Sequence, residues 1–436
     1  MRLLRFIAAA ALLTALLCAQ TSEVGTLPTN KPAAAPEIDT NQAAVQAEHR
    51  KGETALSENR FEDAVQIYNG ILAQDDEDID AHFNLALAYS MLGQDTDAIP
   101  HYQAVLNARP DIFEAKINLG QSLLRSGDPA DAVPVLKAAA EQHPDDFRPT
   151  YFLAESLLET GQNAEAEAAF KAALAIASTQ DISAAPAEFG YARSLLRQQK
   201  LTEAEPHYRA AIELKPELQT SLLELAQAFE KNNQPAEALR IYREFPDNIG
   251  ASERAGAIAL QLGEAEQASE ALEAAVAQDP TRGNRMALAQ AYLDMGQLVD
   301  AQKQVQSLLL DAPNEISLLL LNAQLYRDQR QFPLAANEFR KITQLDPQNG
   351  DAWGEMANML MLEEKYNEAL DAYNRVDALG AAKPGHYFFR AVAHDRLQQD
   401  EEAVKDYERF LSLSHDEAPD QEFQARQRIQ LLKKKH

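Results

Sequence analysis

One spacing constrains this chain more than any other feature. An alanine recurs eleven times, and the successive spacings between its copies are 34, 34, 34, 38, 34, 30, 33, 34, 34 and 34. A fixed period of about 20 to 50 residues indicates stacked repeats, each of which is one supersecondary unit. The recurring alanines are Ala64, Ala98, Ala132, Ala166, Ala204, Ala238, Ala268, Ala301, Ala335, Ala369 and Ala403.

Two further positions recur with each alanine and predict a pair of packed helices in every copy. A small residue stands twelve positions earlier, and a larger apolar residue stands four positions later. Helices approach closely only where small side chains meet, and an i, i+4 spacing keeps the larger residue on the same face. The small residues are Gly52, Ala86, Gly120, Ala154, Ala192, Ala226, Gly256, Ala289, Ala323, Ala357 and Ala391. The larger ones are Tyr68, Tyr102, Leu136, Phe170, Tyr208, Tyr242, Leu272, Val305, Phe339, Tyr373 and Tyr407.

Glycine and proline mark where these helices should end. A glycine between the two helices allows the positive φ that ends the first helix, and a proline twelve positions after the alanine stops the second. The glycines are Gly93, Gly127, Gly161, Gly263 and Gly296, and the prolines are Pro110, Pro144, Pro216, Pro280, Pro313 and Pro347.

Together these positions resemble the tetratricopeptide repeat family, whose helix-turn-helix units stack into a right-handed superhelix. The resemblance implies an all-α, right-handed α-solenoid of about eleven units with a C-terminal capping helix. Units 1–4 would occupy 45–180, units 5–6 would occupy 185–248, units 7–10 would occupy 249–383, the eleventh unit would occupy 384–414, and the capping helix would occupy 415–436. The family's first-helix tryptophan occurs only once, as Trp353.

Two intervals depart from the 34-residue period by four residues. The long one predicts a longer connector at residues 178–184, and the short one predicts a second helix cut early by Pro246, with an altered superhelical angle at residues 245–250.

The N-terminus has the layout of an exported protein. Residues 1–19 begin with Arg2 and Arg5 and continue as an uncharged stretch, which predicts a signal peptide cleaved after Ala19. Lipidation of Cys18 and an uncleaved anchor remain open alternatives. Residues 20–44 lack apolar periodicity and contain three prolines, so we expect a flexible linker. The predicted location is periplasmic or secreted.

Composition and motifs argue against several classes of function. A net charge of -27 argues against a nucleic-acid partner, because the protein would repel the phosphate backbone. The single cysteine, Cys18, lies in the N-terminal stretch, which excludes thiol chemistry and cysteine zinc sites from the body of the chain. The nine histidines lack metalloprotease spacing, and no phosphate-binding loop or nucleophile motif is present. We therefore expect no catalytic residues, no metal site and no cofactor.

The family resemblance implies a binding groove lined by the first helix of each unit, at positions three residues before the small residue. In units 2–6 these positions are apolar: Phe83, Ile117, Tyr151, Phe189 and Leu223. They could receive apolar side chains of a peptide, or they could serve packing alone. Asn84 and Asn118 occupy equivalent positions, where relatives use asparagine to bond a peptide backbone.

Charged residues on the first helices leave two interpretations open. Arg193 and Arg197 could form a basic pocket for a carboxylate or an acidic peptide, or they could pair with Glu155 and Glu159. Arg125, Arg148 and Lys231 lie on neighbouring first helices.

The sequence therefore predicts a non-catalytic scaffold of the cell envelope that binds protein or peptide segments in the groove. One alternative is an envelope assembly or secretion factor that recognises polysaccharide or a secretion component. Another is a cytosolic chaperone adaptor, if the signal peptide is not cleaved. The partner's identity and the oligomeric state stay open.

Overall fold

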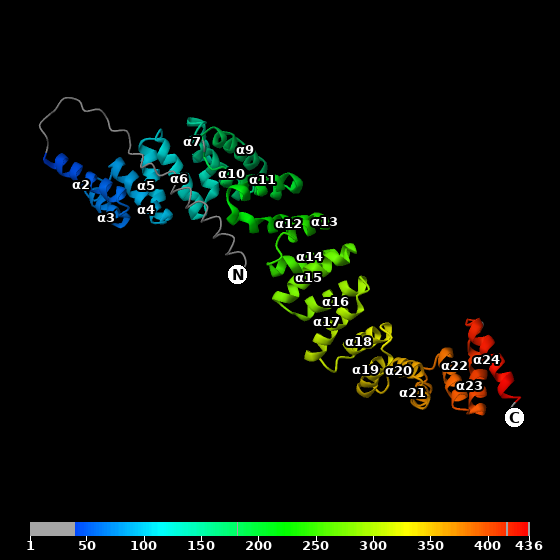
Figure 1. Cartoon of the computed structure of the whole chain (residues 1–436). Helices are drawn as coiled ribbons and strands as arrows, with labels where there is room; N and C mark the ends of the chain where they lie inside the picture. The colour runs from blue at the N-terminus through cyan, green and yellow to red at the C-terminus, as the bar shows by residue number, and fades with distance from the viewer. Residues whose placement is uncertain (1–39, 181, 416, 435–436) are drawn as a thin grey trace. The chain divides into compact units, whose positions relative to one another are not determined.

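The computed structural model describes residues 40–180, 182–415 and 417–434 (Figure 1). The signal peptide, Cys18 and the linker up to residue 39 lie outside the described residues. Within them every regular element is a helix, so the fold is an all-α solenoid of helix-turn-helix units, as predicted.

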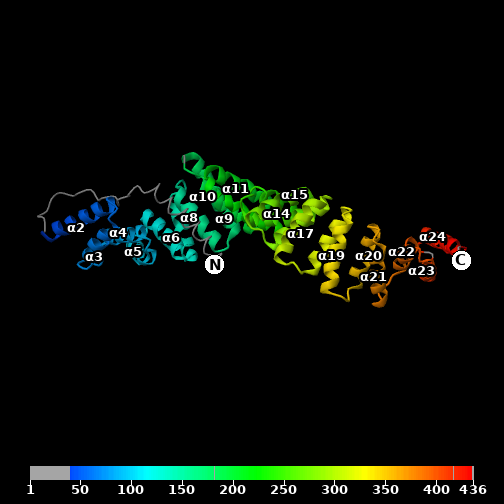
Figure 2. The same cartoon turned by 60° about the horizontal axis from the view of Figure 1, so that its bottom comes forward.

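The described chain divides into two compact units, which we call unit A and unit B. Unit A ends at Asn232 and unit B begins at Asn233, so the division falls between the two helices of the sixth predicted repeat. Within each unit the helices follow one another in chain order (Figures 1 and 2).

Unit A consists of α2 (Thr40–Ser57), α3 (Phe61–Leu72), α4 (Ile79–Met91), α5 (Asp95–Ala108), α6 (Phe113–Ser126), α7 (Pro129–Gln142), α8 (Phe147–Glu159), α9 (Asn163–Gln180), α10 (Ala185–Arg197), α11 (Leu201–Leu214), the 3-10 helix η1 (Pro216–Ser221) and α12 (Leu222–Lys231). Helix α2 begins inside the segment expected to be linker.

Unit B consists of α13 (Pro235–Tyr242), α14 (Ile249–Leu262), α15 (Ala265–Gln278), α16 (Arg282–Asp294), α17 (Leu298–Asp311), α18 (Ile316–Asp328), α19 (Phe332–Leu345), α20 (Gly350–Leu362), α21 (Tyr366–Ala378), α22 (Pro384–Arg396), α23 (Asp400–Leu413) and α24 (Pro419–Leu432).

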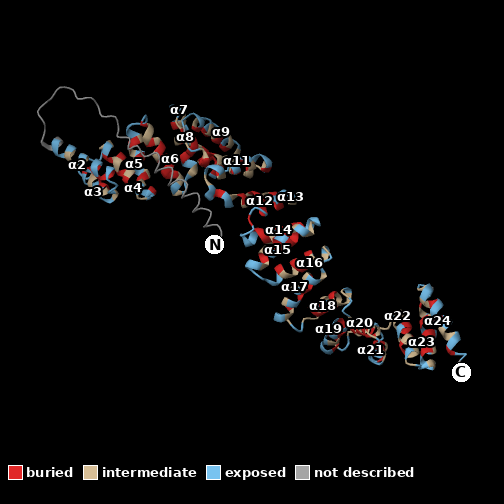
Figure 3. Ribbon diagram, viewed as in Figure 1, coloured by how far each residue is buried: buried red, intermediate tan, exposed pale blue. Residues whose placement is uncertain are grey.

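The three recurring positions build the core. All eleven alanines are 0% exposed, and the residues four positions later are at most 3% exposed. In Figure 3 buried residues alternate with intermediate and exposed ones along the helices of both units. Within each unit the core therefore grows by packing each helix on the next one along the chain.

The turn inside every hairpin is left-handed, five positions before each alanine. Glycine fills it in five repeats, as predicted. In the other six the left-handed residue carries a side chain: Asn59, Gln199, Asn233, Arg330, Glu364 and Gln398, with φ between 56° and 62°. The sequence pattern found only the glycine cases, because a residue with a Cβ gives no visible indication of a positive φ.

The longer connector predicted at residues 178–184 is not present in the structure. The four extra residues of the long interval do not lengthen the connector; they extend α9 to Gln180. Ser178 stands where other repeats have the stopping proline, and its hydroxyl donates to the Ala175 carbonyl 2.8 Å away, inside the helix. In the short interval the second helix ends early, as predicted: α13 ends at Tyr242, four positions before Pro246.

The C-terminal helix α24 packs against α23, as expected for a cap. Leu432 is buried and Ile429 packs against the same apolar cluster as Phe410. Phe423 and Leu431 of the same helix are 62% and 51% exposed.

Candidate binding surface on the first helices of unit A

Successive first helices touch one another in unit A, because α4 contacts α2 and α6, and α8 contacts α6 and α10. Side chains at equivalent positions of α4, α6, α8 and α10 therefore share one side of the stack, and Glu224 of α12 lies close enough to Arg193 of α10 to interact with it. We call this side the first-helix face.

The first three members of the predicted apolar stripe are buried. Phe83, Ile117 and Tyr151 are each 2% exposed. The Phe83 ring lies edge-on to Tyr102 at a centroid distance of 6.0 Å, and the Tyr151 ring lies 6.2 Å from Phe170. These contacts favour the packing interpretation for this part of the stripe.

The last two members of the stripe, Phe189 and Leu223, are half-buried. The Phe189 ring also meets the aromatic side chain of the following helix edge-on, with centroids 5.9 Å apart, at Tyr208. Within the apolar stripe, therefore, only the residues on α10 and α12 remain partly accessible to a ligand.

The two asparagines lie at the surface of the stack. Both Asn84 and Asn118 are half-buried, at equivalent positions of α4 and α6. The Asn118 amide is hydrogen-bonded to the Tyr102 hydroxyl. Among the described residues the Asn84 amide has no such partner, so its donor and acceptor are open to a peptide backbone.

The arginines of α10 are only loosely paired. The Arg197 guanidinium lies 3.4 Å from a Glu159 carboxylate oxygen and donates to the Leu158 carbonyl. The Arg193 guanidinium lies 4.0 Å from the same carboxylate oxygen and makes no hydrogen bond to any described residue. It sits 5.8 Å from the centre of the Phe189 ring.

Two further carboxyl groups flank Arg193 from the neighbouring first helices, Glu155 on α8 and Glu224 on α12. Burial raises the pKa of Glu155 to about 7, although the nearby Arg193 opposes the shift. Burial likewise raises the pKa of Glu224, whose carboxylate accepts a hydrogen bond from the Tyr208 hydroxyl at 3.4 Å. Glu155 therefore changes charge near neutral pH, and Glu224 takes up a proton at a higher pH than an ordinary glutamate does.

The structure thus combines the two interpretations left open by the sequence. Salt bridging is present, but both arginines share one carboxylate, Glu159. The other basic residues of this region have their own acids: Arg125 bonds Asp95 at 2.8 Å, and Arg148 bonds the acids of α6 and its own N-cap. Lys231 is exposed at the end of α12.

Sequence reasoning missed the parts of this surface contributed by Glu224, Tyr208 and Gly190. A Cβ added at Gly190 would lie 3.0 Å from the Glu155 Oε1 and 2.3 Å from the Phe170 ring. Gly190 therefore gives the Glu155 carboxylate the room to lie against α10. The sequence did contain an indication that these two residues belong to the surface, because Gly190 and Glu224 occupy the positions at which α4 and α6 carry asparagine.

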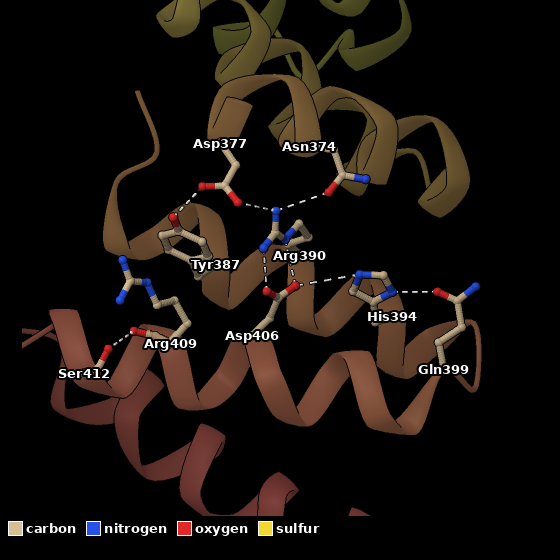
Figure 4. Close-up of polar contacts among 9 residues, drawn as sticks. All are labelled: Asn374, Asp377, Tyr387, Arg390, His394, Gln399, Asp406, Arg409 and Ser412. Atoms are coloured by element: carbon tan, nitrogen blue, oxygen red, sulfur yellow. Dashed lines mark hydrogen bonds and ion pairs between the residues drawn. The ribbon is translucent and has the colours of Figure 1, made fainter. Parts of the chain in front are cut away.

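A second polar cluster lies in unit B, and the sequence reasoning missed it too (Figure 4). The Arg390 guanidinium on α22 makes two bonds to Asp406 on α23, at 2.6 and 2.7 Å. It also donates to Asn374 and Asp377 on α21, at 3.2 and 3.1 Å. The Tyr387 hydroxyl donates to Asp377 at 2.6 Å and lowers the pKa of that carboxyl.

This cluster joins three consecutive helices across the connector at residues 379–383. Its arginine is 13% and its central carboxylate 10% exposed, and each has its partners. We interpret it as a structural link between repeats. The available indication was Arg390 itself, which precedes the small Ala391 where most first helices have an apolar residue.

In residues 40–180, 182–415 and 417–434 no helix is long and apolar enough to cross a membrane. Within those same ranges no three histidine, cysteine or acidic side chains are placed to hold a metal ion.

The hairpins, their left-handed turns and their shared packing positions define a protein built from repeated helix-turn-helix units. Two profiles described as tetratricopeptide repeat match the sequence. One matches residues 117–181, 189–252 and 320–386, and the other residues 55–119 and 259–325. Together they cover well over half of the chain, which therefore belongs to the tetratricopeptide repeat family.

Solved structures share parts of the repeat array. MamA AMB-1 is 25% identical over 39% of this chain and 98% of its own, with a TM-score of 0.36. MamA (41-end) from Desulfovibrio magneticus RS-1 is 20% identical over 40% and 96%, with a TM-score of 0.37. YrrB, described as having an unusual peptide-binding site, is 20% identical over 41% and 93%, with a TM-score of 0.36.

At TM-scores this low the likenesses add nothing to the family assignment. Comparison of the sequence with curated proteins gives no significant match.

Proposed function

We propose that this tetratricopeptide repeat protein is a non-catalytic scaffold of the cell envelope, and that the first-helix face of unit A binds a segment of a partner protein. One observation carries the choice of surface: Arg193 is 26% exposed yet has no hydrogen bond to any described residue. A guanidinium has five donors and favours bidentate contact with a carboxylate. The face therefore holds a cation whose hydrogen bonds remain to be made.

The neighbouring groups suit an extended acidic segment. Arg197 lies one turn beyond Arg193 on α10, and Asn84 and Asn118 supply amide groups at equivalent positions of α4 and α6. Carboxylates of the segment would bond the arginines, and its backbone would bond the amides. Because packed hairpins hold these side chains, binding would order the partner and leave the receptor nearly unchanged.

The envelope location rests on the N-terminal sequence alone, with its two arginines and uncharged stretch. Sequencing the N-terminus of the purified mature protein tests it. A new N-terminus after residue 19 supports export, whereas an intact Met1 on cytosolic protein refutes it.

The binding proposal is tested by affinity capture from envelope extracts, with the captured proteins identified by mass spectrometry. The double reversal Arg193→Glu and Arg197→Glu should abolish capture of the main partner. A matched control, Lys137→Glu with Lys171→Glu, changes the charge equally at exposed sites of α7 and α9 and should retain it. Equal capture by both double variants would exclude this face as the binding surface.

A further inference from the structure

We infer that the arginine pair of α10 binds an acidic segment together with a proton, which is taken up by Glu155 on the neighbouring repeat. This inference rests on the proposed function, and adds that binding to the first-helix face is coupled to pH. Four side chains from three first helices carry it: Arg193, Arg197, Glu155 and Glu224.

The arginine at the centre of the cluster is poorly neutralised by its surroundings. Its nearest ion-pair partner is the Glu159 carboxylate at 4.0 Å, which Arg197 approaches more closely, at 3.4 Å. An ordinary charge-assisted hydrogen bond is about 2.7 to 2.9 Å long. Arg193 can therefore form two short bonds to an incoming carboxylate without first breaking a strong one.

Glu155 is close to the arginines but is not paired with a cation among the described residues. Its Oε1 lies against α10 at Gly190, 3.0 Å from where a Cβ would stand. The groups that act on it are Tyr151 and Glu159 from its own helix and Arg193 and Arg197 from α10. Its carboxyl is thus held in a partly dry position where its charge is only indirectly compensated.

Glu224 occupies the corresponding place on the other side of α10. The Tyr208 hydroxyl of α11 bonds it at 3.4 Å, and Arg193 and Arg197 act on it across α10. It is also unpaired with a cation among the described residues. The arginines are therefore flanked by one acid on each side.

The protonation of these two acids decides the charge that a ligand meets. With Glu155, Glu159 and Glu224 ionised, the cluster with its two arginines carries one net negative charge, and with Glu155 and Glu224 protonated it carries one net positive charge. A ligand carboxylate is repelled by the first state and attracted by the second. Since burial raises the pKa of Glu155 to about 7, both states of this carboxyl are populated at neutral pH.

Linkage fixes the sign of the effect. If the ligand binds better when Glu155 is protonated, binding must raise the pKa of Glu155 and take up a proton, and acid must strengthen binding. For a group with a pKa of about 7, the protonated fraction rises about tenfold between pH 8 and pH 6. The apparent Kd should therefore fall by about tenfold over this range.

The test uses the mature chain and a capped hexaglutamate peptide as the probe, with hexaglutamine as the uncharged comparison. Calorimetric titrations at pH 8 and pH 6, each in two buffers of different ionisation enthalpy, give the Kd and the number of protons taken up. Glutamate side chains of the free probe stay largely ionised over this range. We expect hexaglutamate to bind about tenfold more tightly at pH 6, with proton uptake near neutrality, and hexaglutamine to show no such change.

Three variants assign the effect to Glu155. Glu155→Gln should bind at pH 8 as the native chain binds at pH 6, and should lose the pH dependence and the proton uptake. Glu165→Gln, a matched change at an exposed acid on α9, should retain both. Arg193→Ala should weaken binding at both pH values, and circular dichroism verifies that each variant is folded.

The outcomes separate this inference from the proposed function. Hexaglutamate binding that depends on Arg193 but takes up no proton would overturn the inference and leave the binding face in place. The same holds if Glu155→Gln keeps the native pH dependence. Absence of hexaglutamate binding at both pH values would also overturn it, and the capture experiment with its reversed-charge variants would still decide the proposed function.

Discussion

A very close helix contact in unit A gives a sharp prediction about stability. Gly120 on α6 is buried, and a Cβ placed there would lie 2.3 Å from Cγ and 2.4 Å from Cδ2 of Leu136 on α7. Leu136 is 0% exposed, so its branched end has no free space to move into. Gly120→Ala should therefore destabilise the hairpin, although alanine is the better helix former.

The magnitude follows from two opposing effects. Overpacking a filled core costs about 1 to 3 kcal/mol, and replacing glycine by alanine within a helix gains at most about 1 kcal/mol. Because the added Cβ would lie only 2.3 Å from the Leu136 Cγ, the cost should fall in the upper part of that range, about 2 to 3 kcal/mol, and we expect Gly120→Ala to lower the free energy of unfolding by about 1 to 2 kcal/mol net. Gly70→Ala is the control: Gly70 is an exposed position of α3 with no atom within 4 Å of the added Cβ, and this change should stabilise by about 0.5 to 1 kcal/mol.

A compensating change follows from the other repeats. Both repeats with leucine at this site, Leu136 and Leu272, place glycine opposite it, whereas the repeats with Phe170 and Phe339 carry alanine at the small position, Ala154 and Ala323. Phenylalanine at this site is therefore compatible with a buried alanine at the small position, as these two repeats show. Gly120→Ala combined with Leu136→Phe should therefore recover to within about 1 kcal/mol of the native chain.

Urea denaturation followed by circular dichroism at 222 nm measures these differences, and hydrogen exchange shows whether they arise in α6 and α7. Two results would refute the reasoning. One is a destabilisation by Gly120→Ala of less than about 0.5 kcal/mol, which is below the usual cost of overpacking. The other is a destabilisation by Gly120→Ala that is equally large with and without Leu136→Phe. Neither result is compatible with a clash between these two side chains.

Three further predictions concern hydrogen bonds and charge. The Tyr68 hydroxyl is buried without a partner among the described residues, whereas the Tyr373 hydroxyl donates to Asn358 at 2.8 Å. Tyr68→Phe should therefore be neutral or stabilising, and Tyr373→Phe should lower the free energy of unfolding by about 1 kcal/mol. Urea denaturation measures both changes. Arg390→Ala removes both short bonds to the buried Asp406, which keeps only His394 at 3.7 Å, and should cost about 3 kcal/mol, with faster hydrogen exchange in α22 and α23. Unchanged exchange there would contradict the structural role of the cluster. The hydrogen bond to Asp78, 2.8 Å long, raises the pKa of His49 in the folded chain. The contact therefore stabilises the folded chain fully at a pH below the pKa of histidine in the unfolded chain, about 6.5. Its contribution to stability is lost as the pH rises through the higher pKa of the folded chain. Exchange protection in α2, corrected for the intrinsic pH dependence of exchange, should accordingly be lower at pH 8 than at pH 6, and His49→Ala should remove that difference.

The fold could be predicted because its determinants are local and recur. Each hairpin needs a small residue, an alanine and a larger apolar residue at fixed spacings, and eleven copies make the pattern unmistakable. Where a proline was missing, as at Ser178, the sequence was misread, and α9 continued through the expected connector. The left-handed turns at residues such as Gln199 and Glu364 were invisible for a related reason, since the fold imposes them on residues that do not favour them.

The candidate surface was harder to predict because spacing fixes the face of a helix but not the depth of a side chain. Phe83 and Tyr151 have the spacing of surface positions, yet large rings from the next helix enclose them. Whether Arg193 is paired depends on a distance of 4.0 Å between two helices, and no sequence pattern specifies such a distance. Sequence identified the arginines and left their state open.

The repeat also separates the residues that fold the chain from those proposed to bind. The alanine, its small partner and the larger apolar residue are all buried, whereas Arg193 and Arg197 are 26% and 31% exposed and take no part in the packing of small residues. Loosely paired, partly exposed charges contribute about 0 to 1 kcal/mol to stability. Substitutions at these arginines should therefore change binding while leaving the stack intact. Because the same stack tolerates many residues at these positions, a chain with a net charge of -27 can hold a cation beside two acids whose pKa values are raised by burial.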